Sequence, residues 1–181
     1  MGLPHRPIER LKVEQQVEKF LDDNNIRERY RKQFRINLME VLAYCEDAAL
    51  QPLKDKRVVM VDDAINMLIT HVTALIGCCE SGYGIHFDGR GGIEELCGLI
   101  QESEPDVVLM DYDFDTGVGG TVYLTELHPV MPNIDFVGFS TQGSFKADFL
   151  EAGAIGFLRK DLSEPKGSMF DLAGILAKQE G

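Results

Sequence analysis

The sequence predicts an α/β protein with a doubly wound, five-stranded parallel sheet that follows a helical N-terminal extension. Short, continuous apolar runs such as Val58–Val61 and Val107–Met110 are typical of strands buried on both faces. Segments with helical periodicity alternate with these runs, and right-handed crossovers would then cover both faces of the sheet. A third observation is that chemically useful polar residues directly follow several of the runs.

The expected elements follow one another along the chain without a convincing internal repeat. Strands are expected near residues 57–61, 84–87, 106–110, 136–139 and 155–158. Helices are expected near residues 65–78, 91–103, 119–128, 144–152 and 167–178. The regular alternation indicates five strand–helix units in a single domain.

The extension is expected to span residues 1–52 and the α/β domain residues 53–181, with the boundary near Pro52. A first helix would bury one face, formed by Val13, Val17, Phe20 and Leu21, and break near Asn24-Asn25. A second apolar stripe recurs at helical spacing over residues 30–49: Tyr30, Phe34, Leu38, Val41, Leu42, Cys45 and Ala49. This stripe predicts a helix that could exceed twenty residues.

An amphipathic helical pair cannot leave its apolar stripe in water, so the extension needs a packing partner. Three hypotheses remain open at this point. The helices could cover the chain's own α/β domain, contact a partner protein, or mediate homodimerisation in an antiparallel or bundled arrangement.

Charge is distributed unevenly along the 181 residues, whose net charge is −12. Residues 1–57 contain 12 Lys and Arg against 10 Asp and Glu, whereas residues 58–181 contain six against 20. The acidic part would repel nucleic acid and anionic membranes and would favour cations, including a divalent metal. We expect a cytoplasmic protein without membrane contact, because no apolar stretch suits a bilayer span or a signal peptide and the four cysteines lack metal-ligand spacing.

Candidate functional residues follow four of the expected strands. Asp62 and Asp63 follow the first strand, Asp111 the third, Ser140 the fourth, and Lys160 the fifth. Because the carboxyl ends of parallel strands lie along one edge, these side chains are expected to converge on one cleft. Open α/β sheets place their ligand sites at that edge.

The sequence resembles the receiver domain of two-component response regulators over roughly residues 57–178. The resemblance rests on five motifs, in the family's order and near its spacing: Val61-Asp62-Asp63, Pro105 to Asp111, Phe139-Ser140-Thr141, Ala152-Gly153-Ala154, and Phe157 to Asp161. It implies a flavodoxin-like sheet with strand order 2-1-3-4-5.

The resemblance implies that Asp111 accepts a phosphoryl group from a histidine kinase or phosphotransfer protein. It also implies a Mg²⁺ cofactor held by Asp62, Asp63, Asp111 and the backbone carbonyl of Asp113. The residue types fit these roles, because Mg²⁺ prefers hard oxygen ligands such as carboxylates. An aspartate is a weak phosphoryl acceptor unless the charge of the phosphoryl group is neutralised.

The remaining implied roles concern the phosphoryl oxygens and signal output. Lys160 and Ser140 would contact the phosphoryl group, and Ser140 with Phe157 would form the switch that remodels a protein-binding surface. The expected partner is a downstream protein effector; no DNA-binding module is recognised, so direct DNA binding is not expected. Beyond its own phosphorylation and dephosphorylation, the chain is not expected to be an enzyme. Asp161 and Ser140 depart from the family's usual proline and threonine.

Two alternatives compete with this interpretation. One is a receiver-like scaffold that is never phosphorylated. The other is a phosphatase of the haloacid dehalogenase type, since the segment 113–117 loosely matches that family's first motif. In that family the nucleophile lies on the first strand and the acidic pair comes last, whereas here the acidic pair comes first.

Overall fold

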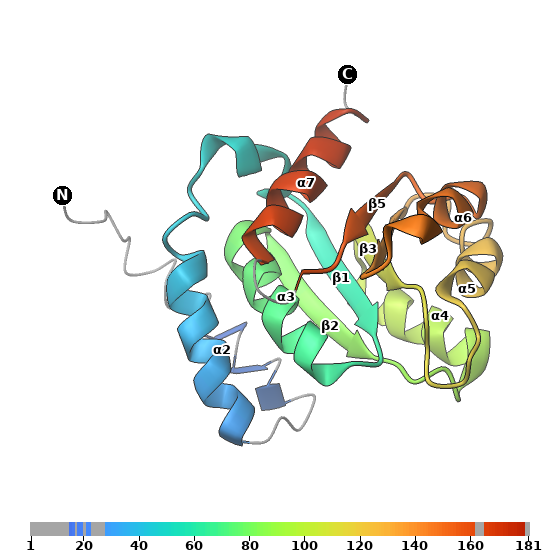
Figure 1. Ribbon diagram of the computed structural model, residues 1–181, viewed down its shortest axis with the longest axis horizontal. Helices are drawn as coiled ribbons and strands as arrows, with labels where there is room; N and C mark the ends of the chain where they lie inside the picture. The colour runs from blue at the N-terminus through green and yellow to red at the C-terminus, as the bar shows by residue number, and fades with distance from the viewer. Residues whose placement is uncertain (1–14, 17, 20, 23–27, 162–164, 180–181) are drawn as a thin grey trace.

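The computed structural model describes residues 15–16, 18–19, 21–22, 28–161 and 165–179. Its centre is a parallel sheet of five strands in the order β2-β1-β3-β4-β5 (Figure 1). The strands are β1 (Arg57–Asp62), β2 (Ser81–His86), β3 (Val107–Asp111), β4 (Asp135–Ser140) and β5 (Gly156–Arg159). The fold class and the strand order expected from the sequence are therefore confirmed.

Helices cover both faces of the sheet (Figure 1). The helices after the first strand are α3 (Ile65–Cys78), α4 (Gly92–Ser103), α5 (Gly120–Leu127), α6 (Lys146–Glu151) and α7 (Pro165–Ala177), with a short 3₁₀ helix η2 (Gly143–Phe145) before α6. Side chains of α3 and α7 share one core cluster, and those of α4, α5 and α6 share another. The sheet thus separates two hydrophobic cores.

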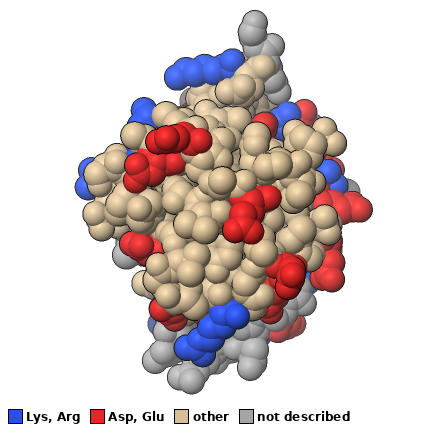
Figure 2. Space-filling view, turned by 90° about the vertical axis from the view of Figure 1, so that its right-hand side faces the viewer, with Lys and Arg blue, Asp and Glu red and all other residues tan. Residues whose placement is uncertain are grey.

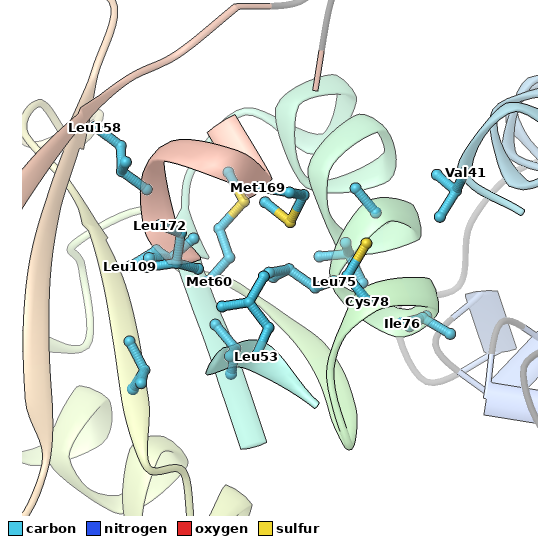
Figure 3. Close-up of a cluster of buried hydrophobic side chains, with 14 of the residues drawn as sticks. Val41, Leu53, Met60, Leu75, Ile76, Cys78, Leu109, Leu158, Met169 and Leu172 are labelled. Carbon is cyan, nitrogen blue, oxygen red and sulfur yellow. The ribbon is translucent and has the colours of Figure 1, made fainter. Parts of the chain in front are cut away.

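The continuous apolar runs in the sequence result from this layering. In β1, Val58 and Met60 point into the core with α3 and α7, whereas Val59 and Val61 point into the other core. Successive strand residues face opposite sides, so a strand buried on both sides needs apolar residues throughout. Figure 3 shows Met60 among the buried side chains of the first core.

The helix of the extension is shorter than its apolar stripe predicts. α2 runs from Glu28 to Val41, and after a series of turns the chain forms a 3₁₀ helix, η1 (Ala48–Leu53). The expectation of more than twenty residues is wrong. The side chain of Asp47 accepts a hydrogen bond from the Ala49 N–H at 2.9 Å, and such a local bond favours a new turn over a continued helix.

The extension packs on the chain's own α/β domain. Leu38 and Val41 of α2 are buried in the same core as α3, and Figure 3 shows Val41 directed toward that helix. A Cβ atom at Gly77 would collide with Val41, so the glycine permits the close approach of the two helices. Leu50 and Leu53 of η1 are also fully buried in this core.

The first expected helix lies largely outside the described residues, including its positions Val13, Val17 and Phe20. Leu21 is described and is buried in the core with α3. Arg31 of α2 contacts the same segment, with ion pairs to Glu18 at 2.9 Å and to Asp22 at 2.6 Å. The two parts of the extension therefore lie side by side.

Figure 2 shows the side of the molecule formed by α4, α5 and α6, where acidic side chains are spread over the surface and Lys and Arg lie near its margins. This distribution agrees with the acidic composition of the α/β part of the chain. Among the residues that the structure describes, no helix combines the length and the apolar character that a bilayer crossing requires.

Candidate functional site

The candidate site lies where three strands end at the same edge of the sheet. Asp62 is the last residue of β1, Asp111 the last of β3, and Lys160 follows β5. β1 and β3 are neighbours, with Val61 in register with Met110, so Asp62 and Asp111 lie on adjacent strands at corresponding positions. The structure brings these three residues together.

Lys160 contacts both carboxylates. Its Nζ atom lies 2.6 Å from Asp62 Oδ2 and 2.6 Å from Asp111 Oδ1. The three residues are at most 8% exposed, and buried charges are stable only when they are paired. One ammonium between two carboxylates leaves an excess of negative charge, which favours a further cation.

The hydrogen bonds distinguish the two oxygens of Asp111. Oδ1 accepts a bond from the Tyr112 N–H at 2.6 Å in addition to its contact with Lys160. Within the described residues, Oδ2 has no hydrogen-bond partner. Oδ2 is therefore the oxygen available for a reaction or for a metal ion.

Burial makes the ionised form of Asp111 costly. Loss of hydration and the neighbouring charge of Asp62 raise the pKa of Asp111 to about 6, although Lys160 opposes this shift. Burial and the charges of Asp111 and Asp115 also raise the pKa of Asp63. The site is short of positive charge, a property that a bound cation would correct.

The donor set fits a divalent metal. Asp62, Asp63 and Asp111 each place a carboxylate oxygen within 4.8 Å of the others. Carboxylate oxygens are the hard ligands that Mg²⁺ prefers, and one or two of them commonly suffice alongside water and phosphate oxygens. Asp113 is exposed and pairs with Gly119 in an isolated β-bridge; the role of its carbonyl as a ligand stays a prediction.

His86 supports the acidic pair, a role that the sequence did not predict. Its Nε2 atom lies 2.8 Å from the backbone carbonyl of Asp63, which it can reach as a donor. The register of the sheet pairs Asp62 with His86 at the ends of β1 and β2. In the sequence, His86 lies inside the expected strand 84–87, one residue before its end.

Ser140 and Phe157 occupy the positions expected for the switch, while their roles stay predictions. Ser140 is buried, and its Oγ atom accepts a hydrogen bond of 3.3 Å from the Gln142 N–H. Its backbone carbonyl accepts a bond of 2.9 Å from the Lys160 N–H, which ties β4 to the lysine. Phe157 is half-buried and packs against Phe149 of α6, with ring centroids 5.9 Å apart.

An aromatic pair beside the site was not found from the sequence. The ring of Tyr112, directly after Asp111, stacks on the ring of Phe145 in η2, with centroids 3.4 Å apart and an interplanar angle of 5°. Tyr112 also contacts Phe149 edge-on at 5.9 Å. The two stacked residues belong to different elements and share no periodic pattern, so no sequence signal connects them.

Comparison by sequence with known protein families and with curated proteins gives no match. Solved structures do match. A LuxR-family two-component response regulator from Aurantimonas sp. SI85-9A1 superimposes with a TM-score of 0.54 and 25% identity, covering 69% of this chain and 87% of that chain. A two-component response regulator from Clostridium difficile gives a TM-score of 0.54 and 14% identity, covering 70% and 100%.

A CheY-like response regulator receiver domain protein from Methanospirillum hungatei JF-1 gives a TM-score of 0.52 and 19% identity, covering 70% of this chain and 98% of that chain. These structures share with this chain the five-stranded parallel sheet, and in this chain an acidic cluster lies at the ends of two of its strands. The chain has the fold of response regulator receiver domains, as the resemblance in the sequence implied.

Proposed function

We propose that the protein accepts a phosphoryl group on Asp111 from a histidine kinase or phosphotransfer protein, with the help of Mg²⁺. The observation that carries this proposal is the buried arrangement of Asp62, Asp111 and Lys160, in which one ammonium contacts two carboxylates at 2.6 Å each. Asp63 lies close enough to complete a metal site with these carboxylates.

The reaction would form a bond between phosphorus and Oδ2 of Asp111. The bond from phosphorus to the donor's imidazole nitrogen would break, and that nitrogen would keep the electron pair. Lys160 and the hydroxyl of Ser140 would hold phosphoryl oxygens, in keeping with the electrostatic character of phosphoryl transfer. The Tyr112 N–H would keep Oδ1 fixed while Oδ2 attacks. A bound Mg²⁺ would neutralise charge on the phosphoryl group.

Output would take the form of a phosphorylation-dependent contact with a downstream protein. Ser140 would turn toward the phosphoryl group, and the hydrogen bond that the Gln142 N–H donates to its Oγ atom would break. Phe157 would follow, since it packs against α6 through Phe149. The chain's own chemistry would be limited to its phosphorylation and dephosphorylation.

The test is the intact mass of the full chain after incubation with acetyl phosphate and Mg²⁺. One phosphoryl adduct is expected, and it should be absent in Asp111→Asn and without metal. Asp115→Asn is the matched control, because Asp115 is exposed in the neighbouring loop and should still give the adduct. An adduct that survives in Asp111→Asn would overturn the assignment.

Other outcomes separate the alternatives. No adduct on folded wild-type protein, even with a panel of histidine kinases, would favour an unphosphorylated scaffold. An adduct that depends on Asp113 instead, with turnover of small phosphoesters, would favour the phosphatase interpretation.

A further inference from the structure

The outward face of α2 combines apolar and charged side chains that are all exposed. Lys32, Ile36 and Glu40 are spaced four residues apart and therefore lie along one ridge of the helix. Met39 lies on the same side, one turn from Ile36. Ile36 is 47% exposed and Met39 58% exposed. We call these four residues the outer α2 face.

This face is distinct from the apolar stripe that recurs over residues 30–49. That stripe is used within the chain, because Leu38 and Val41 are buried against α3. The outer α2 face is on the opposite side of the helix, and Figure 1 shows α2 at the edge of the molecule, with α3 on its inner side. Two of the five exposed large hydrophobic residues of the described chain lie here, within one helical turn.

We propose that the outer α2 face binds the same face of a second copy of this chain, with the two α2 helices antiparallel about a two-fold axis. The first argument is charge complementarity. Lys32 and Glu40 are equally far from Ile36, on either side of it. A two-fold antiparallel arrangement centred on Ile36 places Lys32 of each copy near Glu40 of the other.

Helix packing geometry supports the same arrangement. Ridges formed by residues four apart are inclined to the helix axis, and two helices that cross at about −50° bring such ridges parallel. With Ile36 against Ile36 at the centre, the Lys32–Glu40 pairs then form twice, once at each end of the contact. Within the described part of the chain neither Lys32 nor Glu40 has an ion pair, so both charges are available for this contact.

The charge of the whole chain favours this surface over others. Residues 58–181 contain six Lys and Arg against 20 Asp and Glu, so two receiver domains repel one another when they approach directly. Residues 1–57 have 12 Lys and Arg against 10 Asp and Glu. A dimer formed through α2 brings together the N-terminal parts of the two chains, in which acidic residues are not in excess. It places the acidic α4–α6 sides far from the contact (Figures 1 and 2).

The interface is expected to be small. One helix crossing another buries less than the roughly 800 Å² per partner of a standard protein interface. The dimer should therefore be weak and concentration-dependent. The dimer does not require phosphorylation of Asp111. An experiment can therefore contradict the dimer without contradicting the proposed phosphoryl transfer, and the reverse.

Sedimentation equilibrium of the full, unphosphorylated chain over a wide concentration range tests the proposal. A monomer–dimer equilibrium is expected for the wild type, and Ile36→Glu should abolish it. Leu150→Glu is the matched control, because Leu150 is 44% exposed on α6, away from α2. This variant should dimerise as the wild type does. A wild-type chain that stays monomeric at every concentration would overturn the proposal.

Charge reversal tests the antiparallel register. Lys32→Glu and Glu40→Lys each place two like-charged pairs in the contact and should weaken the dimer about tenfold. The double variant restores both pairs with opposite polarity and should dimerise nearly as well as the wild type. Additive weakening in the double variant would overturn this pairing. Circular dichroism of each variant checks that these exposed substitutions leave the fold intact.

Discussion

The ammonium of Lys160 lies 2.6 Å from the carboxylate of Asp62, and both groups are buried although they are 98 residues apart in the chain. The lysine therefore has a structural role in addition to its proposed contact with a phosphoryl group. It neutralises part of the charge that three neighbouring aspartates concentrate at the end of the sheet. The stability of the fold and the chemistry of the site depend on the same few charges.

Replacing Lys160 should therefore lower the free energy of unfolding. In Lys160→Met, Asp62 and Asp111 lose their shared cation, and breaking a buried ion pair costs about 3–5 kcal/mol in the free energy of unfolding. The cost should be smaller at pH 5 than at pH 8, because the two aspartates can take up protons at the lower pH. Urea denaturation at both pH values measures this difference. Equal losses at pH 5 and pH 8 would contradict the electrostatic explanation.

Asp111→Asn should stabilise the metal-free protein at high pH. Burial and Asp62 raise the pKa of Asp111 from 3.8 to about 6, so the folded state binds this proton more tightly than the unfolded state. The wild type therefore loses stability as the pH rises from about 4 to about 6, and the loss persists above that range. The variant avoids this loss and should gain about 3 kcal/mol at pH 8.

At pH 4 the gain from Asp111→Asn should disappear, because the wild-type carboxyl is then protonated in the fold. Urea denaturation of wild type and variant at pH 4 and pH 8 provides the comparison. A gain of the same size at both pH values would show that the stabilisation does not come from the charge.

Mg²⁺ should raise the melting temperature of the wild type. A metal that binds the folded state alone stabilises it, and protons compete for the carboxylates, so the increase should be larger at pH 8 than at pH 5. Thermal denaturation with and without MgCl₂ measures the effect. Asp63→Asn should remove most of it. Asp113→Asn should retain it, because only the backbone carbonyl of Asp113 is expected to bind the metal.

The strands were predictable because burial on both faces leaves a continuous apolar run, and because the next residue lies at the functional edge. β2 shows the limit of this reasoning. It begins at Ser81, three residues before the expected start. Gly82, the second residue of the strand, lies against the backbone of α3 at Leu75 and Ile76. A close backbone contact of this kind requires glycine and leaves no apolar run in the sequence.

The candidate site was predictable in composition but only partly in its interactions. Asp62, Asp111 and Lys160 follow from strand ends. The 2.6 Å contact of Lys160 with Asp62 depends instead on the long lysine side chain, which reaches from the end of β5 across the sheet edge to β1. The apolar stripe predicted a helix through Ala49, but α2 ends at Val41 and the side chain of Asp47 caps the separate helix η1. Local side-chain hydrogen bonds of this type have no periodic signature.

Gly120 should be essential for the position of Asp111. A Cβ atom at Gly120 would collide with the backbone carbonyl of Asp111 and would approach Met110, so α5 can begin against β3 only with glycine there. We expect Gly120→Ala to cost about 2 kcal/mol and to slow phosphorylation, because the acceptor strand must shift. Gly98→Ala is the control, since nothing lies within 4 Å of its Cβ position in α4. That substitution should stabilise the helix by up to about 1 kcal/mol.

The stack of Tyr112 on Phe145 should hold η2 and α6 in place beside the site. The ring centroids are 3.4 Å apart, and the Gln142 N–H is bound to Ser140 at the start of the same segment. An aromatic pair contributes about 1 kcal/mol beyond the area that it buries, so Phe145→Ala should loosen residues 143–151 locally.

Amide hydrogen exchange measures this loosening directly. Phe145→Ala should speed exchange in α6 while leaving β1 and β3 unchanged, because those strands are buried in the sheet away from the stack. Leu150→Ala is the control: Leu150 is 44% exposed on α6 and should leave the exchange of this segment nearly as in the wild type. If the segment exchanges equally fast in wild type and Phe145→Ala, the stack does not hold α6. The edge-on contact of Tyr112 with Phe149 would then suffice to connect the residue after Asp111 with that helix.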